Sequence, residues 1–100
     1  MSIDDSSAGS VERTERETVI EFPCRFPIKV MGRAVPEFTQ TMAEVVRPHD
    51  PQFDAEEIMV RPSRAGNYLG LTLYIHATSQ EQLDNIYRAL TAHPMVSYVL

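Results

Sequence analysis

The chain has 100 residues, 43% of them hydrophobic, and a net charge of −5. That length is enough for one domain with one modest core. Six acidic residues against two arginines give residues 1–21 a net charge of −4, whereas residues 22–100 carry only −1. The near-neutral part lacks the positive field of a protein that binds a nucleic-acid backbone.

The amino-terminal segment has neither the basic start nor the apolar run of a secretory signal. No stretch of eighteen apolar residues is present to span a bilayer. Cys24 is the one cysteine, which excludes an internal disulfide and a Cys-x-x-Cys metal or redox site. We therefore expect a reduced, cytoplasmic protein with an acidic, disordered tail over residues 1–21 and one folded domain over residues 22–100.

The domain is expected to begin with a strand. Phe26, Ile28 and Val30 alternate with other residues at the period of a strand that has one buried face. Because Pro27 lacks a ladder donor, regular pairing is expected to start at about Ile28. Gly32 is expected to end the strand.

A helix, a short strand and a hairpin loop are expected next. Pro36 suits the first turn of the helix, and the apolar stripe that follows is Phe38, Met42, Val45 and Val46. Residues 57–61 alternate as a second strand. Residues 63–67 form the hairpin loop, in which Gly66 or Asn67 takes a positive φ.

The rest of the chain predicts a strand, a helix and a final strand. The third strand covers residues 68–76, with four aliphatic side chains on one face. The second helix begins at Thr78 or Ser79 with a capping box. The last strand, residues 95–100, is expected to place Val96, Tyr98 and Leu100 inward and Met95, Ser97 and Val99 outward.

This order of elements predicts a ferredoxin-like βαββαβ sandwich, which is an α+β fold. Right-handed crossovers give a four-stranded antiparallel sheet in the order 4-1-3-2, with both helices on one face. The other face of the sheet is then open.

The open face mixes methionine, tyrosine and a few polar side chains, and it is either a contact surface or ordinary strand coverage. Its acidic second strand ends in a proline, which discourages edge pairing. We therefore expect a homodimer or a different protein partner to bind on the open face, through Met31, Met59, Tyr74 and Val99.

RNA recognition motifs share this strand order and stack bases on aromatic side chains of the first and third strands. Tyr68 and Tyr74 occupy the third strand, but the first strand offers Lys29 and Met31 instead of an aromatic. Together with the lack of positive charge, this argues against a nucleic-acid partner.

Two candidate ligand sites remain. Arg61 and Arg64 flank the turn at Gly66 and Asn67 and could bind an anion, although a solvated hairpin tip is the simpler reading. The turn that begins Gly32-Arg33 is the second candidate, for a small ligand.

No group of residues has the spacing of a catalytic or metal site. His49, His76 and His93 are scattered, with no i, i+4 pair among them. Neither a nucleophile–base pair nor a phosphate loop is present. We therefore expect no cofactor, no metal and no enzymatic activity.

Six short stretches together resemble the YbeD-like family of small bacterial proteins. They are KVMG at 29–32, VPE at 35–37, PS at 62–63, GNY at 66–68, AT at 77–78 and VL at 99–100. The resemblance covers about residues 22–100 and implies an ACT-like, ferredoxin-type fold.

The resemblance also carries expectations about function. Family genes tend to lie beside the gene for the lipoyl (octanoyl) transferase, which implies a regulatory link to lipoate synthesis. ACT domains bind amino acids where the first strand meets the first helix, which is the turn at Gly32, but many of them have an acidic residue where Met31 stands here. The expected function is a non-catalytic regulatory or adaptor domain that binds a protein, with a small-ligand sensor as the alternative.

Overall fold

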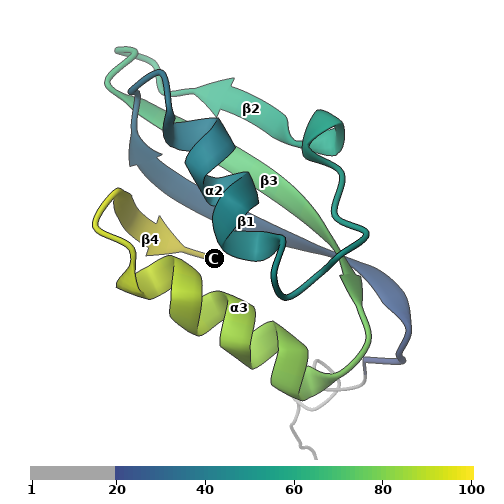
Figure 1. The fold of residues 1–100 in the computed structure, drawn as a ribbon. Helices are drawn as coiled ribbons and strands as arrows, with labels where there is room; N and C mark the ends of the chain where they lie inside the picture. Colours follow the sequence, from purple (N-terminus) through teal and green to yellow (C-terminus); the bar gives the residue numbers. More distant parts are fainter. Residues whose placement is uncertain (1–19) are drawn as a thin grey trace, which may run out of the picture.

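Four antiparallel strands form one sheet in the order β2-β3-β1-β4, and both α-helices lie against the same face (Figure 1). The computed structural model describes residues 20–100. The elements are β1 (Cys24–Arg33), α2 (Phe38–Val46), the 3₁₀ helix η3 (Ala55–Glu57), β2 (Met59–Pro62), β3 (Tyr68–Ala77), α3 (Gln80–Ala92) and β4 (Val96–Val99).

This architecture confirms the expected βαββαβ sandwich and its strand order. The expectation that the tail is disordered falls on residues 1–21, nearly all of which lie outside the described part. Within residues 20–100 no helix has the length and apolar character needed to cross a bilayer.

The core lies between the sheet and the two helices. The inward residues of β1 and β3 alternate in sequence with outward ones, and α2 and α3 each contribute one apolar stripe. The fully covered side chains include Ile28, Val30, Phe38, Met42, Val46, Leu71, Leu73, Ile75, Leu83, Ile86 and Leu90. Burial of such a set is the main stabilising term of the fold.

Pro27 lies inside β1, which corrects the expectation that pairing starts at Ile28. The ladder with β3 begins at Cys24, opposite Ala77, and includes Pro27 opposite Tyr74. In a strand, the N–H groups of every second residue point to the same side. The N–H of Lys29 points to the β4 side of β1 and donates to the carbonyl of Leu100, just after β4. The donor that Pro27 lacks would point the same way, beyond the end of β4, so its absence costs no ladder bond.

The register of β4 also differs from the expected one. Val99 pairs with Val30 and Val96 pairs with Gly32, with an irregularity between them that shifts the phase of the strand by one residue. Val99 therefore packs against the core on the helix side, as does Met95. The assignment of Val99 to the open face is wrong for this reason. That of Met95, which lies just before β4, is wrong because its side chain packs on the core.

The same shift moves two residues onto the open face. Tyr98 pairs with Met31, and Leu100 exchanges backbone hydrogen bonds with Lys29 at 2.8 and 3.3 Å. Tyr98 is 50% exposed and Leu100 is 69% exposed. The inward orientation expected for these two side chains is therefore wrong.

Candidate interaction surface on the open sheet face

Two rows of side chains cross the open face at right angles to the strands. The first row runs Arg61, Gly70, Met31 and Tyr98, from β2 through β3 and β1 to β4. The second row runs Met59, Thr72, Lys29 and Leu100 in the same direction. Residues in such rows are nearest neighbours across a sheet, so these eight form one continuous surface. We call it the open-face groove.

The groove is a hollow of about 400 Å³, and all eight residues line it. Gly70 forms part of its floor and contributes no side chain. A Cβ at this position would have only ordinary contacts, at 3.5 Å from the Met31 methyl carbon and 3.6 Å from the Arg61 carbonyl. The hollow therefore exists because a glycine lies between longer side chains on the neighbouring strands.

Exposed apolar side chains border this groove. Met59 is 58% exposed on the β2 side, and Tyr98 and Leu100 are exposed on the β4 side. A second, shallower hollow adjoins the first, and its lining is Met31, Tyr68, Ser97 and Tyr98. Contiguous exposed apolar surface with a polar border is typical of contact sites.

All the charge on the four strands is positive. The strand sequences contain no aspartate or glutamate, and their cations are Arg25, Lys29, Arg33 and Arg61. Each of the four is exposed, and each lies on the open face, since the register places it opposite the outward residues of β3.

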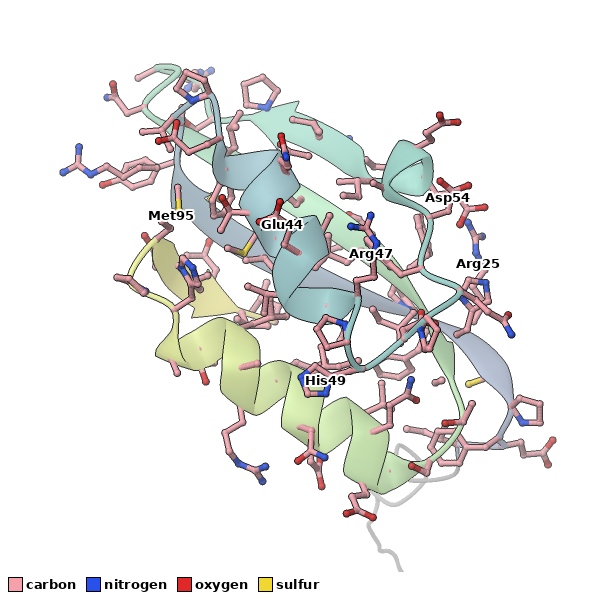
Figure 2. The ribbon with its side chains drawn as sticks, in the orientation of Figure 1. Arg25, Glu44, Arg47, His49, Asp54 and Met95 are labelled. Atoms are coloured by element: carbon pink, nitrogen blue, oxygen red, sulfur yellow. The ribbon has the colours of Figure 1, made fainter. Side chains whose placement is uncertain are left out.

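The acidic residues lie outside the strands, although Glu57, just before β2, reaches Arg25 at one end of the open face. Those of residues 20–100 belong to the helices, to the segments that flank them and, for Glu21, to the segment before β1: Glu21, Glu37, Glu44, Asp50, Asp54, Glu56, Glu57, Glu81 and Asp84. Glu44 projects from α2 on the helix-covered side of the molecule, as Figure 2 shows. Nine acidic against seven basic residues give this part of the chain a net charge of −2, yet its open face is positive. The near-neutral total conceals this segregation of charge.

One end of the open face is held by a small polar cluster. The Arg25 guanidinium lies 3.9 Å from the centre of the Tyr74 ring and 3.6 Å from a carboxylate oxygen of Glu57. The Tyr74 hydroxyl lies 3.6 Å from the Met59 sulfur. Arg25 therefore covers one face of the Tyr74 ring. Met31 and Met59 line the groove, whereas Tyr74 does not.

The candidate ligand residues are partly brought together. The Ala34 N–H donates to the Asn67 carbonyl at 3.0 Å, so the turn after β1 adjoins the β2–β3 hairpin. Gly66 has a φ of +81°, a backbone conformation that glycine adopts more readily than other residues, which explains why a glycine stands at this position. Arg61 lines the groove, whereas Arg64 is an exposed residue of the hairpin loop.

Gly32 is a packing residue in this structure. A Cβ here would overlap the Met95 carbonyl oxygen and lie 2.5 Å from two ring carbons of Phe38. The Phe38 ring thus fills the space on the inner side of Gly32. Arg33 points the other way, onto the open face opposite Tyr68.

The histidines have separate surroundings. His76 Nδ1 lies 3.1 Å from an Asp50 carboxylate oxygen, and His93 Nδ1 accepts from the Met95 N–H at 3.1 Å. His49 lies in the segment after α2 (Figure 2). Among residues 20–100 no group of three or more His, Cys, Asp or Glu side chains is arranged to hold a metal ion.

Comparison with known proteins identifies the family. A family model described as "Protein of unknown function (DUF493)" matches residues 17–100. The chain belongs to the DUF493 family. The YbeD-like resemblance inferred from the sequence motifs is confirmed by this match.

Curated relatives in this family are bacterial proteins of similar length. A UPF0250 protein of Bordetella pertussis is 61% identical over 84 residues, which are 84% of this chain and 92% of the relative. The UPF0250 protein of Neisseria gonorrhoeae is 53% identical over 89 residues, covering 89% of this chain and 98% of the relative. Residues 1–16 lie outside the family match.

A solved structure has the same fold. The solution structure of protein HP0495 from H. pylori superposes with a TM-score of 0.70, covering 93% of this chain and 98% of that one. The sequence identity is 13%, so the likeness shows the fold alone.

Proposed function

We propose that this DUF493-family protein is a small adaptor or regulatory domain that acts by binding another protein on its open sheet face. The observation that carries the proposal is the open-face groove, a hollow of about 400 Å³ between exposed apolar residues of β2 and β4. The two methionines on it, Met31 and Met59, are side chains that adapt to varied apolar partners.

The charge of the face favours a different protein over a second copy of this chain. A two-fold symmetric dimer would bring the open face of one copy against the same face of the other. Lys29 and Arg61 would then meet cations, with no acidic strand residue on either side to neutralise them. Like charges in an interface oppose association.

A small-ligand sensor is the second candidate, because the volume of the groove falls within the range of about 300–1,000 Å³ usual for ligand pockets. Thermal unfolding against a panel of amino acids and lipoate-pathway metabolites separates the two functions. A ligand at a hundred times its Kd adds about 2.7 kcal/mol to the free energy of unfolding. The adaptor proposal predicts no specific shift across the panel.

Affinity capture from a lysate of the source bacterium tests the adaptor proposal directly. Tyr98→Asp and Met59→Asp each place an acidic group on the groove, and each is expected to remove the proteins captured by the wild type. Both side chains are at least half exposed, so the fold should tolerate the change. Gln40→Asp, on the exposed surface of α2, is the matched control and should leave capture intact.

Capture that is unchanged in both groove variants would contradict the proposal. So would loss of capture in Gln40→Asp alone, because that result would move the contact to the helix side. Circular dichroism of each variant keeps unfolding from being mistaken for lost binding.

A further inference from the structure

The sign of the charge on the open face identifies the chemistry of the partner. We propose that the open-face groove binds an acidic segment of a partner protein, one that also carries a large apolar side chain. This inference rests on the proposed adaptor function and adds to it the class of partner.

The first step of the argument concerns charge. Lys29 and Arg61 both line the groove, on β1 and β2, with the bare floor at Gly70 beside them. Within residues 20–100 neither of them forms an ion pair with an acidic side chain. A carboxylate that docks beside either one would be attracted without first displacing an ion pair among the described residues, and the cations of the strands would orient the approach.

The second step concerns the apolar part. The floor at Gly70 leaves room for an incoming side chain, and Met31 of β1, Met59 of β2 and Leu100, just after β4, would contact it. An aliphatic or aromatic anchor that is buried in a pocket, with charged pairs at the rim, is the usual form of a peptide hot spot. The partner segment therefore combines acidic residues with one such anchor.

Single-stranded RNA would also find cations here, and Tyr68 and Tyr98 are exposed, but Tyr74 and the middle of β1 are poorly suited to stacking bases. The Arg25 guanidinium covers one side of the Tyr74 ring at 3.9 Å. The middle of β1 presents Lys29 and Met31, which are not aromatic.

Selection from a random library of twelve-residue displayed peptides on the immobilised full-length chain tests the inference. We expect the enriched peptides to have a net negative charge and a large apolar residue flanked by Glu or Asp. Their affinity should fall as salt is raised from about 50 to about 300 mM, because exposed charges are screened. Lys29→Glu and Arg61→Glu should each weaken binding by about tenfold or more.

Arg47→Glu and Arg88→Glu are the matched controls, since both arginines are exposed on the helix side. They make the same change in net charge and should leave peptide affinity within about twofold, since they lie away from the groove. Equal losses in all four variants would show that only net charge matters and would overturn the inference.

Other outcomes are equally decisive. Enrichment of neutral or basic peptides that still depend on Lys29 or Tyr98 would overturn the acidic class while leaving the adaptor function standing. An enriched set that is indifferent to every groove variant, or no enrichment at all, would contradict both. Displacement of the peptides by poly-uridylate with higher affinity would make the face a nucleic-acid surface and overturn the inference. Tight binding of a synthetic peptide of residues 1–19 at the groove would overturn it too, by assigning the groove to this chain's own acidic segment.

Discussion

The Asp50 carboxylate accepts a hydrogen bond from the backbone N–H of His76 at 2.9 Å, in the part of β3 that extends beyond its partner strand β2. β2 pairs with β3 only as far as Thr72, opposite Met59. Asp50 is 2% exposed and also accepts from the Gln52 N–H at 3.1 Å. One side chain from the α2–β2 connection thus continues the ladder that the short β2 leaves incomplete, and fixes the connection to the sheet.

Asp50→Ala should lower the free energy of unfolding by about 1–3 kcal/mol, because it leaves the backbone N–H groups of His76 and Gln52 without their acceptor at part-buried positions. Urea denaturation followed by circular dichroism measures the change. Asp54→Ala is the control: its carboxylate accepts from the Glu56 N–H at 2.9 Å, but at an exposed position where water can replace it. Equal losses in the two variants would contradict this role of Asp50.

Gly32→Ala should destabilise the fold by about 1–3 kcal/mol, since the new methyl group overlaps the Phe38 ring and the Met95 carbonyl. Gly70→Ala is the matched control, because its methyl group would have contacts no closer than 3.5 Å. Thermal unfolding of both variants decides the point. If Gly32→Ala were as stable as the wild type, the close packing of β1 on α2 would be refuted.

Leu73→Ala should lower the free energy of unfolding by about 2–5 kcal/mol, because Leu73 is fully covered in the middle of the sheet. Leu100→Ala, at a side chain that is 69% exposed, should change it by less than about 0.5 kcal/mol. Chemical denaturation separates the two results. A small effect at Leu73 would place the core elsewhere.

Burial raises the pKa of the Tyr87 hydroxyl above its usual value of 10.0. The unfolded chain therefore loses this proton at a lower pH than the folded one does. The stability that the neutral hydroxyl contributes is fully present below about pH 10 and is lost as the pH rises through the folded-state pKa. Ultraviolet titration of tyrosinate should lose its highest-pH component in Tyr87→Phe, and a component that persists in this variant would contradict the assignment.

The fold was predictable from the sequence because the periodicities of Ile28, Val30, Leu71 and Leu73 reflect burial, which also determines the structure. The phase of β4 was not. A strand irregularity depends on the partner strand, and six residues that alternate regularly carry no sign of it. Tyr98 was therefore missed as a groove residue, and Val99 was wrongly placed there.

The charge of the groove could have been found from the sequence. The alternation that puts Lys29 and Arg61 outward is visible in the printed sequence. The predicted second strand, residues 57–61, still included Glu57, whereas β2 begins at Met59 and has no acidic residue. Summing the charge over the whole domain concealed this pattern, because the helices carry the opposite sign. The hollow over Gly70 needed the three-dimensional register, since it depends on which residues are its neighbours across the sheet.

Site-specific photo-crosslinking in living cells tests the open-face contact most directly. A benzophenone amino acid replaces Tyr98 in one version of the protein and Glu44, on the helix-covered side, in another (Figure 2). An open-face contact predicts a discrete crosslinked protein from position 98, lost on adding Arg61→Glu, and none from position 44. Crosslinks from position 44 alone, or from neither position, would contradict it.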